Sequence, residues 1–190
     1  MLKPTAVFIN TIKKGFEDKL MYYGYEKVLN NLQNTDFFTA PASTRFHDSF
    51  ESGLIHHTFR VYNKLKLLND QLLLDFNDKQ IFKVSLAHDF CKIDTYKIEM
   101  RNTKNELGEW VKVPYYTYDD SNFPYGHGEK SVQLAELYGL DLSLEEKMAV
   151  RWHMGGFDAS VKGGYNISNV FDNYKLALYL HIADMLATYD

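Results

Sequence analysis

Apolar residues recur at intervals of three and four along several stretches of the chain, the spacing of one face of an α-helix. Between residues 16 and 33 this spacing is loose and predicts one amphipathic helix. From Leu54 to Leu72, apolar residues follow at steps of 7, 4, 3 and 4, and they predict a second helix with His57 on its inner face. The pattern therefore favours a helical core.

Three more helices are predicted further along the chain. Steps of three and four lead from Ile81 to His88 and indicate a helix over about residues 79–89, with His88 pointing inward. Steps of four lead from Leu176 to Asp184 and indicate a last helix. Polar side chains thus recur on faces that are otherwise apolar.

The remaining predicted helix begins with a capping signature. Ser143 and Glu146 have the S-x-x-E spacing in which the two side chains cap the first turn, and the helix is expected to run to His153.

Two stretches interrupt the helical pattern. Residues 34–53 are rich in Thr, Ser, Asn, Asp, Pro and Gly without a sustained period, which predicts a long ordered loop. Alternating apolar positions from Tyr96 to Met100, a turn over Asn102–Gly108 and a second strand from Trp110 predict a β-hairpin.

The length and composition indicate a single globular unit. The chain has 190 residues, of which 45% are hydrophobic and 24% charged, so it can bury a sizeable core. We expect residues 1–40 to form a helical extension packed on a main domain of residues 41–190. An inserted hairpin and an aromatic loop are expected at about residues 95–125.

Charge and cysteine content exclude several function classes. The net charge of −4 provides no extended basic surface for long nucleic acid. The single cysteine, Cys91, excludes an intrachain disulfide and a multi-thiolate zinc site, and it fits a reducing, cytoplasmic setting. No window approaches ~20 uninterrupted apolar residues, so no membrane span is expected. The oligomeric state stays open.

The inward-facing polar residues on separate helices point to a metal site. A buried imidazole or carboxylate without partners is costly, so these groups must satisfy one another or bind an ion. Imidazole and carboxylate donors suit Mn²⁺, Fe²⁺, Co²⁺, Ni²⁺ or Zn²⁺. The candidate ligands are His57, His88, Asp89, His127, His153 and Asp184.

His57, the doublet His88–Asp89 and Asp184 resemble the H…HD…D signature of the HD-domain metal-dependent phosphohydrolase superfamily. The blocks "LAHDFCKI", "FPYGHGEKSV" and "RWHMGG" are most similar to the branch that contains the HD-type 3′–5′ exoribonucleases. The resemblance extends from about residue 41 to residue 187. It implies an all-α fold, an HD-domain helical bundle in which those four residues hold one metal ion.

The same resemblance implies a second ion. His127 and His153 match the extra histidines of the two-metal subclass, with Asp89 as the bridging ligand. Relatives often have a second histidine where this chain has Met154, and the related exoribonucleases have an oligonucleotide-binding barrel for which residues 1–40 are too few.

The residues around these ligands indicate a phosphorylated substrate. Lys92 matches the lysine of the HDxxK block, where it would neutralise phosphate charge, and with Asp89 it is the predicted catalytic pair. Arg45 and His47 in the long loop are predicted to fold over the metal and bind substrate. Tyrosines are predicted either to stack on a base or to pack within the hairpin. The stacking candidates are Tyr115, Tyr116, Tyr118 and Tyr125, whereas His56 and His181 are interpreted as structural.

The sequence therefore predicts a metal-dependent phosphohydrolase or phosphodiesterase. Its expected substrate is a nucleotide, a cyclic nucleotide or a short oligonucleotide. Two alternatives stay open: an HD-fold diiron oxygenase of a small molecule, and a nucleotide sensor without turnover.

Overall fold

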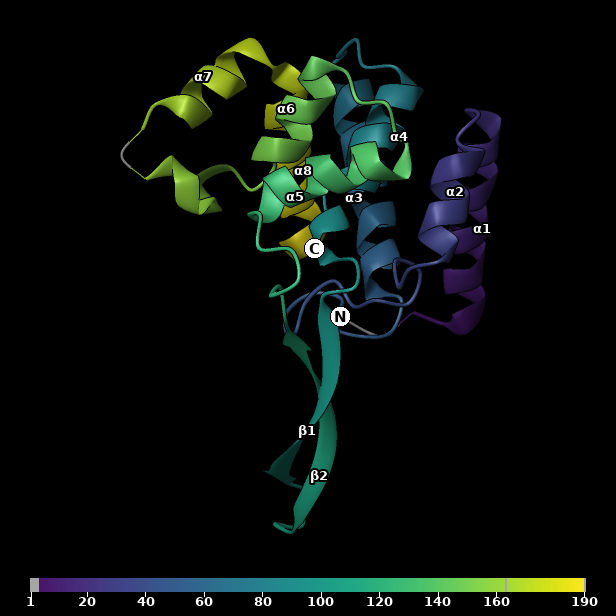
Figure 1. Ribbon diagram of the computed structural model, residues 1–190, viewed down its shortest axis with the longest axis vertical. Helices are drawn as coiled ribbons and strands as arrows, with labels where there is room; N and C mark the ends of the chain where they lie inside the picture. Colours follow the sequence, from purple (N-terminus) through teal and green to yellow (C-terminus); the bar gives the residue numbers. More distant parts are fainter. Residues whose placement is uncertain (1–3, 163, 190) are drawn as a thin grey trace.

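The computed structural model describes residues 4–162 and 164–189, which form eight α-helices and one two-stranded antiparallel hairpin. Figure 1 shows the helices gathered into one body, with the hairpin extending away from it. The helices are α1 (Ala6–Tyr22), α2 (Glu26–Gln33), α3 (Gly53–Gln71), α4 (Asp78–Ala87), α5 (His127–Tyr138), α6 (Leu144–Trp152), α7 (Asn166–Asn173) and α8 (Lys175–Tyr189). The strands are β1 (Tyr96–Lys104) and β2 (Trp110–Tyr118).

Helix α3 lies at the centre of the body, where it packs against α4 and α8. Its predicted inner face is confirmed at Leu54, Val61 and Leu65, which are fully buried, but not at Leu72, which follows the last residue of α3 and is exposed. The predicted start of α6 is also confirmed: Ser143 and Glu146 form a capping box, in which each side chain accepts a hydrogen bond from the backbone of the other residue.

The prediction of one helix over residues 16–33 is wrong. Helix α1 ends at Tyr22, Gly24 adopts a φ of +77°, and the Tyr25 amide donates to the Leu20 carbonyl before α2 begins. This is a glycine-based helix stop, since a positive φ is costly for residues with a Cβ atom. Both helices bury apolar residues in the same core, so the apolar spacing continues across the break.

The long loop between α2 and α3 is held in shape around Asp48. The Asp48 carboxylate contacts His56 at 2.9 Å and Arg60 at 3.5 Å, and its carbonyl accepts a hydrogen bond from the Ala42 amide. A Cβ atom at Gly53 would lie 1.9 Å from that carbonyl, so only glycine fits at this position. The loop is thereby fixed against the first turn of α3.

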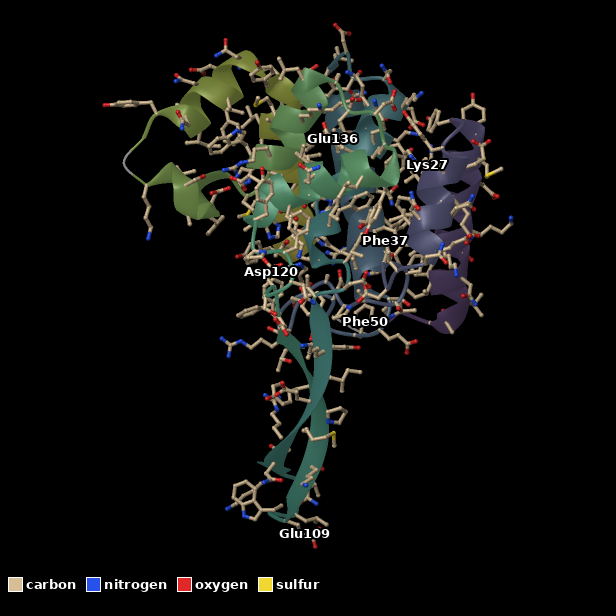
Figure 2. All side chains as sticks on the ribbon, in the orientation of Figure 1. Lys27, Phe37, Phe50, Glu109, Asp120 and Glu136 are labelled. Atoms are coloured by element: carbon tan, nitrogen blue, oxygen red, sulfur yellow. The ribbon has the colours of Figure 1, made fainter. Side chains whose placement is uncertain are left out.

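The predicted hairpin is confirmed, with a shorter turn than expected. Its ladder runs from the pair Tyr96–Tyr118 to the pair Lys104–Trp110, because β1 continues to Lys104. In Figure 2 the side chains of the hairpin stand clear of the helices, with Glu109 at the far end. Among the described residues, no helix combines the length and apolar character needed to cross a membrane.

Candidate metal centre

Imidazoles from four helices meet around the carboxylate of Asp89. Its Oδ2 lies 3.7 Å from Nε2 of His57 and 3.3 Å from Nε2 of His88. Its Oδ1 lies 3.1 Å from Nε2 of His127 and 3.8 Å from Nε2 of His153. The fold therefore brings together residues that are far apart in the sequence.

Asp184 completes this cluster from α8, where its Oδ1 lies 3.0 Å from Nε2 of His57. The ring centroids of His57 and His88 are 5.3 Å apart, and those of His127 and His153 are 5.1 Å apart. All six predicted metal ligands thus lie in one buried or half-buried group.

The ends of two helices orient two of these imidazoles in the same way. His88 follows the last turn of α4, and its Nδ1 lies 2.7 Å from the carbonyl of Ser85. His153 follows the last turn of α6, and its Nδ1 lies 2.7 Å from the carbonyl of Val150. A carbonyl only accepts, so Nδ1 donates in both rings. In a neutral ring Nε2 then presents a lone pair to the cluster, whereas in a protonated ring Nε2 donates as well.

These Nε2 atoms provide the test of whether a metal ion fits. Within the described residues, Nε2 of His88 and Nε2 of His153 are buried and have no hydrogen-bond partner. Both face oxygens of Asp89 that also offer only lone pairs when ionised. Acceptor atoms facing one another repel unless a positive charge lies between them. At His88 a proton can supply it, because the Asp89 carboxylate outweighs burial and raises the pKa of this imidazole; at His153, which stays neutral, a metal ion would supply it. Neutral imidazoles held through their other nitrogen are the usual form of metal-bound histidine.

The donor atoms divide into two groups around Asp89. One potential ligand from each of His57, His88 and Asp89 lies within 4.8 Å of the others, and the same holds for Asp89, Cys91 and His127. These residues could hold one ion or two, with the Asp89 carboxylate shared between the positions.

Electrostatics keep the carboxylates of the cluster ionised. Burial favours the protonated form of Asp89, but the charges of Lys92 and His88 outweigh it and hold its pKa well below the usual range. Burial together with the charges of His127 and His88 lowers the pKa of His153 to about 3. Anionic carboxylates and a neutral imidazole are the protonation states that a cation requires.

The pKa of His127 is shifted in the opposite direction to that of His153. Burial lowers its pKa, but the nearby thiol of Cys91 and the Asp89 carboxylate raise it to about 10. A positive charge at this position is therefore favourable, and either a proton or a metal ion would supply it.

A cavity of about 590 Å³ opens onto the cluster. Its polar wall includes Asp89, Lys92 and Asp184, and the ammonium of Lys92 lies 2.7 Å from Oδ2 of Asp89. Much of the remaining wall is apolar and includes Met154 and Phe157. A small molecule in this cavity would contact the donor cluster and one lysine together.

The two loop residues predicted to bind substrate are placed differently. His47 lines the cavity, and its ring centroid lies 4.7 Å from that of His57. Arg45 is exposed and does not line the cavity; its guanidinium lies 4.9 Å from the ring centroid of Phe46. The loop turns outward at Arg45 and returns at His47.

Of the four tyrosines predicted to stack on a base, Tyr118 lines this cavity, whereas Tyr115, Tyr116 and Tyr125 do not. Tyr115 donates a 3.0 Å hydrogen bond to Glu99 on the outer part of the hairpin, and Tyr116 lines a separate hollow. The aromatic residues of the hairpin that line the main cavity are Tyr96 and Tyr118, because they form the ladder pair nearest the body.

Two residues of the site were not predicted. Cys91 lies two residues after Asp89, and its Sγ is 3.3 Å from Nδ1 of His127. His181, interpreted from sequence as structural, lines the cavity and contacts the carbonyl of His153 through Nδ1 at 2.7 Å. Its position one helical turn before Asp184 was the available signal.

A scan of protein-family models finds no match to this chain, and searches of curated proteins and of solved structures also find none.

Proposed function

We propose that the chain is a metal-dependent phosphohydrolase or phosphodiesterase with an HD-type site, acting on a small nucleotide-like phosphate ester. The observation that carries the proposal is the convergence of four imidazoles and two carboxylates, in which the buried Nε2 atom of neutral His153 faces the Asp89 carboxylate without a hydrogen-bond partner. This arrangement is costly without a cation and favourable with one.

The donor set indicates which residues would hold the ions. His57, His88, Asp89 and Asp184 would bind one ion, and His127 and His153 would bind a second that shares Asp89. Histidine and carboxylate donors suit Mn, Fe, Co, Ni or Zn as the divalent metal. Such an ion supplies Lewis acidity, which polarises a phosphoryl oxygen and lowers the pKa of water.

Lys92 would orient and neutralise the reacting phosphate. Its ammonium is largely buried, pairs with Asp89 and lies on the cavity wall. Burial disfavours its charged form, but the Asp89 carboxylate more than compensates and raises its pKa. The lysine therefore stays cationic, and a phosphate at the cluster would meet a fixed positive charge.

The cavity supports a small substrate rather than a polymer. Its volume of about 590 Å³ lies within the range of small-molecule sites, and Tyr96 and Tyr118 offer aromatic surface for a base. The net charge of −4 provides no track for long nucleic acid.

An HD-fold diiron oxygenase of a small molecule is the second candidate. The apolar cavity wall around the histidine-rich cluster favours it, since oxygen chemistry benefits from exclusion of water. Lys92 beside Asp89 favours phosphate chemistry over this alternative and over a sensor without turnover.

The test combines metal analysis with a substrate panel. We expect purified protein to contain a divalent metal and to hydrolyse phosphomonoesters or phosphodiesters when Mn²⁺ is added. Asp89→Asn should lose both metal and activity. Lys92→Ala should lower kcat by about 10²-fold with a smaller loss of metal, as for removal of one electrostatic group at a reaction centre.

Lys14→Ala is the control, because Lys14 is exposed and pairs only with Asp18 across one turn of α1 in the described contacts. Its turnover should match the wild type. Oxygen consumption with a phosphate-free substrate would indicate an oxygenase rather than a phosphohydrolase. Rates that climb steadily along a series from mononucleotide to long RNA would reject the small-substrate cavity.

A further inference from the structure

The hairpin has two chemically different faces. Alternation along the ladder places Ile98, Met100, Trp110, Pro114, Tyr116 and Tyr118 on one side, called the apolar face below. The opposite side carries half-buried Val111 and Val113 together with polar residues, among which Glu99 accepts hydrogen bonds from Tyr115 at 3.0 Å and from Thr117 at 3.3 Å. The large apolar side chains of the ladder that are exposed therefore all lie on the apolar face.

The apolar face is exposed along most of its length. Ile98 is 66% exposed, Met100 56% and Trp110 70%. In Figure 1 both strands project beyond the helices, so the body covers only their base. An isolated two-stranded hairpin is marginally stable in water, and exposed apolar patches of this kind mark contact surfaces.

The two ends of this face have opposite charge. Lys112 and Lys104 point from it near the tip, as their ladder positions require. At its base a hollow of about 290 Å³ is lined by Asp36 and Glu51 together with Ile98. Tyr116 lines the same hollow, so Glu51 lies beside the base of the apolar face.

We propose that the apolar face binds the same face of a second copy of this chain, with the two hairpins antiparallel. A two-fold axis at the pair Met100–Pro114 places Lys112 of each copy opposite Tyr116 and Glu51 of the other. It likewise places Lys104 opposite the Tyr96 end, where Asp36 lies. In this register the positive tip of each copy lies against the negative base of the other, which is the self-complementarity that an isologous interface requires.

The composition of the hairpin disfavours nucleic acid as the partner. Residues 96–118 contain four Lys or Arg and three Glu, so their charge sums to +4 − 3 = +1. This is too little for a phosphate track.

The register also places the second copy at the mouth of the cavity. Trp110 of the second copy would lie opposite Tyr96 and Tyr118, which line that cavity. A ladder of nine residues is only about 30 Å long. The contact is therefore small, and we expect dimers that dissociate on dilution.

Sedimentation velocity over a wide concentration range tests the pairing. We expect the full chain to move from monomer to dimer as its concentration rises. Met100→Glu places a charge at the proposed axis and should abolish the dimer. Thr103→Glu places the same charge on the opposite face and should leave the dimer intact.

A charge exchange tests the register independently. Lys112→Glu and Glu51→Lys should each weaken the dimer at least tenfold, and the double variant should restore it. Circular dichroism and metal content should stay at wild-type values in all variants, which separates this test from that of the metal site. A wild-type chain that is monomeric at every concentration, dimers unaffected by Met100→Glu, or a double variant no better than the single ones would overturn the proposal.

Discussion

Asp36 and Asp94 join the long loop to the turn that follows Lys92. The Asp94 amide donates to Oδ1 of Asp36 at 2.7 Å, and the Asp36 amide donates to Oδ1 of Asp94 at 3.2 Å. Burial raises the pKa of Asp36, the hydrogen bond from the Asp94 amide lowers it, and the Asp94 charge raises it again, so that the pKa is about 6. The folded chain therefore binds a proton at Asp36 more tightly than the unfolded chain does.

This difference fixes the direction of a pH effect. Between pH 4 and 6 the folded state keeps a proton that the unfolded state has lost, so stability falls as the pH rises through this window. We expect Asp36→Asn to remove that loss. The variant should be more stable than the wild type by about 1 kcal/mol at pH 7.5, after allowing for solvent screening, and close to it at pH 4.

Thermal denaturation at both pH values measures the effect. Asp70→Asn is the matched control, since it removes the same charge from an exposed position in α3 and should change stability little at either pH. A gain for Asp36→Asn that is equal at pH 4 and pH 7.5 would contradict the assigned cause.

Several candidate ligands could be predicted individually, because the period of a helix determines which of its side chains face the core. His57, His88 and Asp184 share the apolar faces of their helices, so helical periodicity was enough to point them inward. Arg45 and Tyr115 were not predictable in this way. A loop has no period, and strand alternation separates two faces without showing which pair lies against the body.

The break between α1 and α2 depends on the backbone of one glycine. Gly24 has a φ of +77°, and a Cβ atom built there meets no atom within 4 Å. Any effect of alanine at this position therefore comes from the backbone conformation rather than from a clash. Gly15 also has open space around it, but it lies inside α1.

These two glycines give a paired prediction with opposite signs. Gly24→Ala should lower the free energy of unfolding by about 1 kcal/mol, because alanine resists a positive φ. Gly15→Ala should raise it by about 0.5–1 kcal/mol, because alanine favours a helix interior. Urea denaturation of both variants provides the comparison, and two changes of the same sign would refute the proposed role of Gly24.

The break between α1 and α2 was not predicted, because the spacing of apolar residues indicates which residues are buried but not whether they belong to one continuous helix. Leu20 and Leu32 pack into the same core from two helices, so their spacing resembles that of one. By contrast, α6 was predicted with its first turn because the capping residues Ser143 and Glu146 are local to it. Elements with local start signals were predicted well, and a stop marked by a single glycine was not.

Across the entire fold, the candidate metal centre joins segments that are distant in the chain. His57 and Asp184 are 127 positions apart and meet at 3.0 Å. Asp89 lies between them at the end of α4, where it also faces α5 and α6. An ion bound here would tie five helices together, so its binding free energy would add to the stability of the fold.

Two adjacent histidines on α3 allow the effect of ion binding on stability to be distinguished from the effect of side-chain packing. His57 faces the cluster, whereas His56 is buried against Asp48. We expect Mn²⁺ to raise the wild-type Tm, because an ion at about 100 times its Kd stabilises the folded state by roughly 2.7 kcal/mol. His56→Ala should lower the Tm by leaving Asp48 with one partner fewer, at a cost of about 1–3 kcal/mol, yet keep the full shift with Mn²⁺. His57→Ala should lose most of that shift.

Thermal denaturation of the three proteins, each with Mn²⁺ and with a chelator, gives the comparison. Equal shifts in both variants would mean that the ion binds elsewhere, and the acceptor atoms around Asp89 would then need another explanation.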